Sequence, residues 1–444
     1  MKKLIWLAWI ILMIAAATYF GYRLLADANK TVFLVGETTD GHHQIEMACG
    51  ACHTSPFGGG ELLQESCVSC HGAELKLAND AHPKSKFTDP RNADRLEHLE
   101  ARYCVTCHQE HHRDRTLPMG VTQPIDFCFH CHQDIADERP SHRGMGFETC
   151  ASAGCHNYHD NRALYEDFLH KFADEPALKP SGRTPVLAGL AQKHPGMDIV
   201  PLSIGRADHA TSRDEISHAW AQSAHAQAGV NCKGCHQPEA SNIWEDKPGV
   251  AVCQTCHAAE AETFFQGKHG MRLNPELPIS LPPMTPALGR LPFKSEAAHR
   301  ELTCNSCHGA HQYDTRKAAV ESCLGCHDDE HSRNYEKSAH AQLWKDELSG
   351  AAPVGAGVSC ATCHMPRIEA DIASGKRVLV NHNQNDNLRP NEKMLRSVCQ
   401  SCHGLPFGID ALADPQLIKN NFSAQPAAHI ESIDMVKARP QTQH

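Results

Sequence analysis

One long apolar run dominates the hydrophobic pattern of the chain. It covers residues 4–22 and directly follows Lys2 and Lys3. An apolar helix of about 20 residues can span a bilayer, and positively charged flanking residues stay on the cytoplasmic side. The pattern therefore predicts a transmembrane helix within residues 1–25, with the rest of the chain outside the cytoplasm.

A cleaved signal peptide is the alternative interpretation of this segment. Ala26-Asp27-Ala28 has the small-residue pattern of a cleavage site. Against cleavage, the apolar run is longer than the usual core of a signal peptide, and further residues separate it from that site. We expect an uncleaved anchor.

Beyond this run, no segment is apolar enough to cross a membrane, and the 30 glycines and 26 prolines favour turns over long regular elements. Hydrophobic residues make up 41% and aromatic residues 6% of the 444, which leaves a thin apolar core. The net charge of −10 and the lack of a basic block argue against nucleic-acid binding. The 22 cysteines and 33 histidines instead imply a bound inorganic or haem framework.

All 22 cysteines fall in pairs that are followed at once by histidine. Ten pairs have the spacing C-x-x-C-H, namely Cys49/Cys52/His53, Cys67/Cys70/His71, Cys104/Cys107/His108, Cys128/Cys131/His132, Cys232/Cys235/His236, Cys253/Cys256/His257, Cys304/Cys307/His308, Cys323/Cys326/His327, Cys360/Cys363/His364 and Cys399/Cys402/His403. The eleventh is stretched to C-x4-C-H, at Cys150, Cys155 and His156.

This motif is the attachment signature of c-type haem. The two thiols bond covalently to the porphyrin, and the adjoining histidine is placed to become the proximal iron ligand. A single pair could be a zinc knuckle or a redox dithiol, but neither requires a histidine after every second cysteine. Eleven repetitions therefore predict eleven covalently bound haem c groups.

The density of haem sites also predicts the fold class. Eleven motifs in 444 residues leave about 40 residues per haem, so porphyrin faces would replace aliphatic side chains as the packing surface. We expect a mainly α chain with much irregular coil, almost no sheet, and short helices that hold the motifs. Haems would form the core of this multihaem cytochrome c architecture.

The positions of the motifs predict the domain organisation. Five motifs lie in an expected pentahaem domain at 26–165, and six lie in a hexahaem domain at 216–430. A Pro-rich, haem-free linker at 166–215 separates them, and 431–444 would form a tail. A second Pro-rich insertion, Pro275–Pro292, is expected to cover porphyrin edges.

Motif spacings and a pentapeptide recur within the chain. Gaps of 18 and 37 residues separate the first three proximal histidines, and gaps of 19 and 37 separate His308, His327 and His364. The sequence Ser-Ala-His-Ala-Gln begins at Ser223 and again at Ser338, each time ahead of a motif. These recurrences predict duplicated haem modules.

The motifs resemble the multihaem cytochrome c group, which includes class III cytochromes, pentahaem nitrite reductases and octahaem hydroxylamine-oxidoreductase-like proteins. A histidine three residues after the proximal one, as in His108/His111, His156/His159 and His308/His311, is similar to class III usage. Cys360–Pro366 resembles the C-H-M-P segment of the nitrite- and hydroxylamine-metabolising families. The resemblance covers nearly everything after residue 45 and implies haems packed closely enough to conduct electrons.

Distal ligands are expected among the 22 histidines that remain when the proximal ones are set aside. Methionine is the other common sixth ligand, but none lies in an evident distal context, so we expect low-spin bis-histidine haems. The favoured distal ligands are His111, His112, His159, His225, His269, His311, His331 and His340. Further candidates are His82, His98, His142, His170, His218, His299 and His382.

Two functions follow from these expectations. The first is a periplasmic electron carrier between a quinol-oxidising membrane donor and a terminal reductase or outer-membrane conduit. The second is an oxidoreductase acting on a small nitrogen or sulfur compound at one open haem. The nitrite reductases attach their catalytic haem through C-x-x-C-K, whereas all eleven motifs here end in histidine, which favours the carrier. Since likeness of fold does not establish function, both stay open, as does a structural role within a cytochrome complex.

The expected location is the periplasmic side of the bacterial inner membrane, because c-type haem is attached there. Residues 4–22 would contact that membrane, or the protein would be soluble in the periplasm after signal cleavage. The expected partners are redox proteins.

Overall fold

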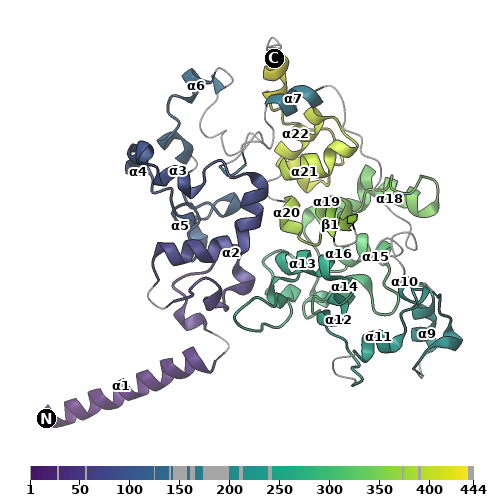
Figure 1. Cartoon of the computed structure of the whole chain (residues 1–444), viewed down its shortest axis with the longest axis horizontal. Coiled ribbons are helices and arrows are strands. Elements are labelled where there is room, and N and C mark those ends of the chain that lie inside the picture. The colour runs from purple at the N-terminus through teal and green to yellow at the C-terminus, as the bar shows by residue number, and fades with distance from the viewer. Residues whose placement is uncertain are drawn as a thin grey trace. The chain divides into compact units, whose positions relative to one another are not determined.

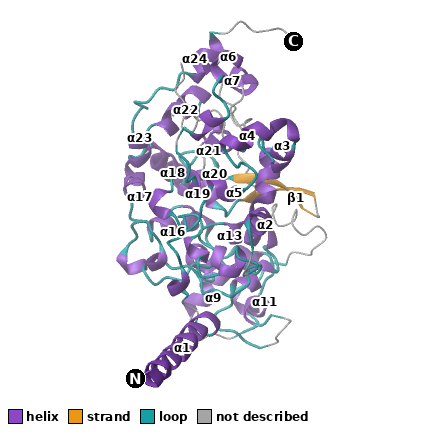
Figure 2. Cartoon of the chain, turned by 90° about the vertical axis from the view of Figure 1, so that its left-hand side faces the viewer, coloured by secondary structure: helices purple, strands orange, loops and turns teal. Residues whose placement is uncertain are grey.

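The structure is a computed structural model that describes residues 2–27, 30–55, 58–124, 126–139, 142–143, 158–160, 166–173, 200–209, 214–238, 243–372, 375–388 and 392–438. Short helices joined by loops account for most of this part of the chain (Figure 2). Its one sheet is an antiparallel pair, β1 (Arg367–Ile372) and β2 (Gly375–Val380), with Arg367 opposite Val380. The prediction of a mainly α chain with much coil is confirmed.

The chain divides into two compact units. Unit 1 comprises Met1–Lys76, Pro83–Phe127 and Glu276–Ile279, and it contains the first three motifs. Its helices are α1 (Lys2–Leu25), α2 (Gly60–Ala78), α3 (Lys84–Thr88), α4 (Ala93–His98) and α5 (Cys104–Cys107), with the end of α2 passing into unit 2 (Figure 1).

Unit 2 comprises Leu77–His82, Cys128–Pro275 and Ser280–His444. Its helices are α6 (Ile135–Glu138), α7 (Glu166–Phe172), α9 (Asp214–Ala221), α10 (Ala224–Gln227), α11 (Cys232–His236), α12 (Val250–Gln254), α13 (Ala258–Gln266), α14 (Cys304–His308), α15 (Thr315–Ala319), α16 (Glu321–Leu324), α17 (Glu330–Asn334), α18 (Ala339–Ser349), α19 (Cys360–His364), α20 (Gln384–Leu388), α21 (Glu392–Ser397), α22 (Leu405–Ala413), α23 (Pro415–Lys419) and α24 (Ser432–Lys437).

These units differ from the domains expected from motif spacing. The division falls between Phe127 and Cys128, inside the expected pentahaem domain at 26–165. Most of the expected linker at 166–215 and the stretched motif at Cys150–His156 lie outside the described residues. The allocation of haems to domains therefore stays a prediction.

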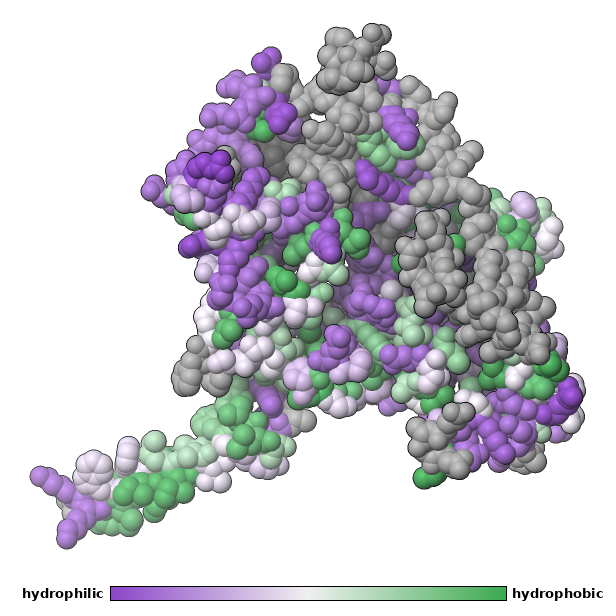
Figure 3. All heavy atoms as spheres, viewed as in Figure 1, coloured by the Kyte–Doolittle hydropathy of each residue, from purple (hydrophilic) through white to green (hydrophobic). Residues whose placement is uncertain are grey.

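The first helix, α1, has the composition of a membrane segment. It is the one described helix that is long and apolar enough to cross a bilayer, and its large apolar side chains are exposed. Figure 3 shows these residues as a nearly continuous hydrophobic surface along α1. A signal peptide has the same properties, so this helix is consistent with both an anchor and a cleaved leader.

Short helices hold several motifs, as expected. The helices α5, α11, α14 and α19 each begin at the first cysteine of a motif. At α19, the Ser359 hydroxyl accepts from the Thr362 backbone amide and the Thr362 hydroxyl accepts from the Ser359 amide. Such a capping box satisfies helix-end donors and defines where the helix starts. Local hydrogen bonding thus positions the attachment cysteines of this motif.

Apolar side chains form a small core around the C-terminal helices. Leu395 of α21 and Leu405 of α22 are almost fully buried, and Leu169 of α7 and Ile433 of α24 join them. Residues from the expected linker and from the expected tail therefore pack into unit 2. The helices α21 and α22 lie side by side in this region (Figure 1).

The second Pro-rich insertion reaches the first motif. A Cβ atom added at Gly50 would lie 3.3 Å from Cγ of Pro278, so the loop contacts the backbone between Cys49 and Cys52. Glycine at this position permits that close approach.

Candidate haem-binding sites

Nine of the proximal histidines each face a second histidine that lies outside the motifs. The pairs, with the distance between ring centroids, are His53–His111 at 6.4 Å, His71–His42 at 5.8 Å, His132–His82 at 6.1 Å, His236–His311 at 5.9 Å, His257–His225 at 6.0 Å, His308–His382 at 6.3 Å, His327–His269 at 6.2 Å, His364–His331 at 6.1 Å and His403–His340 at 6.1 Å. No ring occurs in two pairs. Of the other two proximal histidines, His108 donates through Nδ1 to Gly120 O at 3.1 Å, and His156 lies outside the described residues.

These separations match the geometry of two imidazoles on one iron. A metal–nitrogen bond is about 2.0 Å and the bonded nitrogen lies roughly 1.1 Å from the ring centre, so the two centroids lie about 6.2 Å apart. The interplanar angles range from 10° to 87°. Ligation permits this range because each ring can rotate about its own iron–nitrogen bond. The histidines thus fit a haem iron held from both faces.

Backbone hydrogen bonds orient several of the distal rings. Nδ1 of His111 donates to Gly36 O at 3.0 Å, that of His382 to Val380 O at 2.9 Å, and that of His331 to Ile418 O at 2.5 Å. The proximal His236 is held in the same way by Glu245 O at 2.6 Å. Metal-bound histidines usually donate their second nitrogen to a carbonyl or carboxylate, which leaves Nε2 deprotonated for the metal.

Burial keeps the deeper histidines neutral. It is the main cause that lowers the pKa of His269 to about 4, and His327, His364 and His382 add to the effect. Burial likewise lowers the pKa of His308 to about 4, helped by His382. A neutral imidazole offers the lone pair that an iron ligand requires.

The cysteines of neighbouring motifs also meet. The first cysteines of two motifs are hydrogen-bond partners at Cys67–Cys104, Cys253–Cys304 and Cys323–Cys360. All twenty cysteines in the described part of the chain are thiols rather than disulfide partners. Each contact therefore brings the first cysteines of two motifs beside each other.

The expected attachment cysteines differ in their exposure to solvent, although their motifs are alike in sequence. The second cysteine is exposed in five motifs, at Cys52, Cys70, Cys131, Cys256 and Cys402. Three of these, Cys52, Cys131 and Cys402, directly follow a single turn of 3₁₀ helix. The side chains around these five thiols leave them open to solvent.

Cys326 is the one buried thiol among the described cysteines. The Lys294 amide donates to its carbonyl at 2.8 Å, and the Arg300 guanidinium approaches its Sγ at 3.8 Å. The polypeptide therefore covers this thiol more than it covers the other described cysteines. Its role in attachment, like that of the exposed cysteines, stays a prediction.

Residues 41–133, which contain the first four motifs, match the family model of cytochrome c3. This match supports a multihaem c-type cytochrome. The matched segment begins just before His42 and ends just after His132, so it includes three of the nine histidine pairs. Comparisons with curated proteins and with solved structures found no significant match.

The two units share one arrangement of three consecutive motifs. In each unit, one distal histidine lies 11 residues before the proximal histidine of the first motif, and its ring faces the proximal histidine of the second motif. Another distal histidine lies three residues after the proximal histidine of the third motif, and its ring faces the proximal histidine of the first motif. The first set is His42, His53, His71, His108 and His111, and the second is His225, His236, His257, His308 and His311. The gaps between motifs had instead suggested His308, His327 and His364 as the counterparts of the first three proximal histidines.

The repeated pentapeptide has the same role at both of its positions. Ser223 caps α10 by accepting from Ala226 N, and Ser338 caps α18 by accepting from Ala341 N. The histidine after each cap, His225 or His340, is the distal member of a pair. In both places a buried serine thus caps the helix that carries the paired histidine.

The structure brings many of the expected distal histidines into pairs. From the favoured set these are His111, His225, His269, His311, His331 and His340, and from the further candidates they are His82 and His382. His42 was missed, although its 11-residue offset from His53 equals that of His225 from His236.

The remaining candidates lie elsewhere. His112 and His299 are exposed and outside the pairs, as is the helical His218. His159 approaches Asp80 through Nδ1 at 3.1 Å, and its ring lies edge-on to Tyr158. His142 lies in a short described segment, whereas the side chains of His98 and His170 are outside the described part.

Proposed function

We propose that the chain is a periplasmic multihaem electron-transfer protein that carries eleven covalently bound haem c groups. It passes electrons between a quinol-linked partner in the inner membrane and a terminal reductase or outer-membrane conduit. When bound, haem supplies one-electron exchange between ferric and ferrous iron. The protein supplies the cysteines that attach the groups and the histidines that hold each iron.

One observation carries this proposal: the nine histidine pairs place an imidazole on both faces of nine of the eleven expected irons. A substrate at such a site would first have to displace a side chain. Outer-sphere electron exchange needs no displacement, so this ligand set supports a carrier. The cysteine contacts between motifs support short distances between successive haems.

The proposed location rests on two features. Covalent haem attachment takes place outside the bacterial inner membrane, and α1 has the length and composition of a single-pass anchor. Lys2 and Lys3 at its start favour an N-terminus in the cytoplasm. The haem-bearing part would then face the periplasm.

A single contact favours the alternative, an oxidoreductase acting on a small nitrogen or sulfur compound. Asn421 Nδ2 lies 3.2 Å from Nε2 of His331, where it competes with iron for the same lone pair. Asn421 and the following Phe422 both have a positive φ, an uncommon conformation for such residues that is associated with functional sites. The haem attached at Cys360 and Cys363 is therefore the candidate open site.

Electron paramagnetic resonance of the oxidised protein tests the two functions against each other. The carrier predicts low-spin ferric signals that nitrite, hydroxylamine and cyanide leave unchanged. A high-spin signal that shifts with these compounds, and that Asn421→Ala removes, would establish the open site at His331 instead. Ligand-sensitive high-spin iron in the native protein would overturn the carrier proposal.

A further inference from the structure

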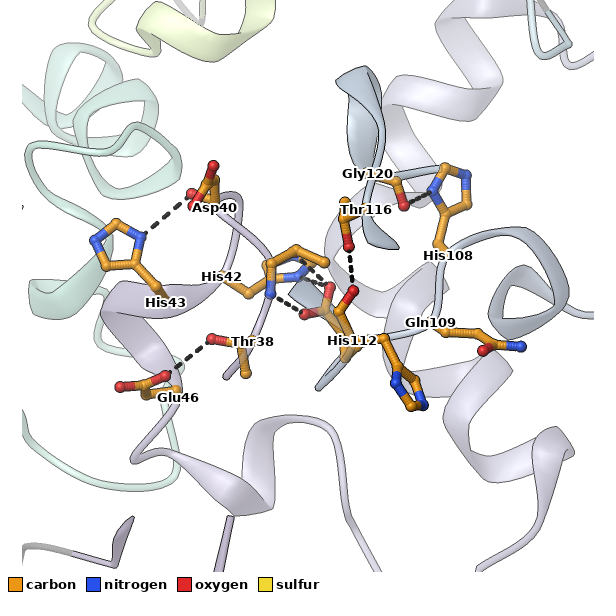
Figure 4. Close-up of polar contacts among 12 residues, drawn as sticks. Thr38, Asp40, His42, His43, Glu46, His108, Gln109, His112, Thr116 and Gly120 are labelled. Carbon is orange, nitrogen blue, oxygen red and sulfur yellow. Dashed lines mark hydrogen bonds and ion pairs between the residues drawn. The ribbon is translucent and has the colours of Figure 1, made fainter. Parts of the chain in front are cut away.

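Glu110 holds the distal histidine of the second motif. Its Oε1 lies 2.6 Å from Nδ1 of His42, and the Thr39 hydroxyl and amide donate to its two oxygens at 2.8 Å each. Figure 4 shows His42 with the hydrogen bonds drawn beside its ring as dashed lines. Burial alone would raise the pKa of Glu110, but the hydrogen bonds from His42 and Thr39 lower it to about 2.

Three other distal histidines have a different kind of Nδ1 partner. His111, His331 and His382 donate Nδ1 to backbone carbonyls, which are neutral dipoles. Within the described part of the chain, the other imidazole–carboxylate contacts of the paired histidines are longer, at 3.6 to 3.9 Å. His42 thus shares its proton with a full negative charge.

The opposite face of the same expected iron also meets a carboxylate. The proximal ligand there is His71, and its Nδ1 lies 3.6 Å from Oε2 of Glu74. The nearby cation Arg113 contacts Glu37 and Asp40 rather than Glu110. Both axial histidines of one haem therefore lie against negative groups.

A carboxylate on Nδ1 makes the imidazole a more basic ligand, which stabilises ferric over ferrous iron and lowers the reduction potential. In the adjoining motif, the proximal His108 donates to a neutral backbone carbonyl, Gly120 O, at 3.1 Å. The two motifs touch through Cys67 and Cys104. Neighbouring haems would then differ in potential because their histidines have different hydrogen-bond partners.

We propose that Glu110 is a positioning residue that makes the haem attached at Cys67 and Cys70 the last in unit 1 to be reduced. This inference rests on the proposed function, since it assigns an energy step within the electron path. The step would direct electrons from this haem toward the neighbour attached at Cys104 and Cys107. Glu110 acts through His42 and does not touch the iron.

Redox titration of the full-length holoprotein, followed by haem absorbance and electron paramagnetic resonance, tests the proposal. Glu110→Gln keeps the shape and hydrogen-bond acceptor but removes the charge. We expect about one-eleventh of the absorbance change to move to higher potential, with all haems retained and low-spin. Unchanged potentials in this variant would overturn the proposal.

Glu46→Gln is the matched control. Glu46 lies in the same unit and accepts from the Thr38 hydroxyl at 3.1 Å, so the variant removes an equal charge on a neighbouring residue. It should leave the titration unchanged. A shift as large as that of Glu110→Gln would show a general charge effect and overturn the proposed role of the His42 hydrogen bond.

A second variant acts in the opposite direction. Thr39→Val removes one hydroxyl donor from Glu110 and leaves more of its charge on His42, so the same haem should move to lower potential. If Glu110→Gln loses haem, Thr39→Val provides the test in its place. A higher or unchanged reduction potential of this haem in Thr39→Val would then contradict the proposal. The titration contains no nitrite or cyanide and measures only how the potential of this haem responds to Glu110, so failure here leaves the carrier proposal standing.

Discussion

His382 faces His308 with 6.3 Å between their ring centroids, although 74 residues separate them in the chain. His308 comes from the C-terminal end of α14, and His382 follows β2, whose Val380 carbonyl accepts from its Nδ1 at 2.9 Å. The hairpin of β1 and β2 thus brings a candidate distal ligand to a motif far earlier in the sequence.

Removing that ligand should open one iron. His382→Ala should convert one low-spin haem to high-spin ferric iron that binds cyanide, because Nε2 of His382 is the expected sixth ligand. The exposed His299 lies outside the pairs and provides the control. Low-spin spectra in His382→Ala, or a high-spin signal in His299→Ala, would contradict the assigned pair.

Haem stoichiometry should equal the number of motifs. Since every cysteine belongs to a motif, we expect eleven haems and no free thiol in the mature protein. The intact mass of acid-extracted protein should exceed the polypeptide by eleven haem masses. A deficit would point first to Cys150–His156, whose longer loop demands a tolerant maturation system.

The cap of α23 should stabilise the site around His331. Asp414 accepts from the backbone amides of Gln416 and Leu417, and Ile418 of the same helix accepts from His331. Asp414→Ala should lower the free energy of unfolding by about 1 kcal/mol, the usual effect of losing an N-cap. Asp414→Asn, which still accepts, should retain most of it in a denaturant titration.

The same cap predicts a pH dependence. Hydrogen bonds from backbone amides lower the pKa of Asp414, so the folded chain binds its proton less tightly than the unfolded chain. The stabilisation is present above the unfolded pKa and is lost as the pH falls through the lower folded pKa. Asp414→Asn should reduce the acid sensitivity of unfolding, and an unchanged pH profile would argue against this contribution.

The membrane anchor can be tested directly. If α1 is retained, carbonate-washed membranes should keep the protein, and N-terminal sequencing should begin near Met1. A soluble product that starts near Asn29 would instead establish signal cleavage.

Sequence patterns predicted the local features of the sites. Each attachment motif is contiguous, so Cys104, Cys107 and His108 are recognisable without a fold. The apolar run within α1 and the serine caps before His225 and His340 are local in the same sense. Distal histidines were harder to assign, because a ring such as His42 differs from His43 only in where the chain places it.

The sequence by itself therefore determined the number and positions of the attachment motifs, since covalent haem chemistry requires a continuous stretch of chain. Only the tertiary structure decided which second histidine meets each of the nine proximal ones, and which attachment thiols are covered, as at Cys326. It also placed Glu110 against His42, 68 residues away. Such contacts depend on how loops and short helices pack across long distances in sequence, and no local periodicity encodes them.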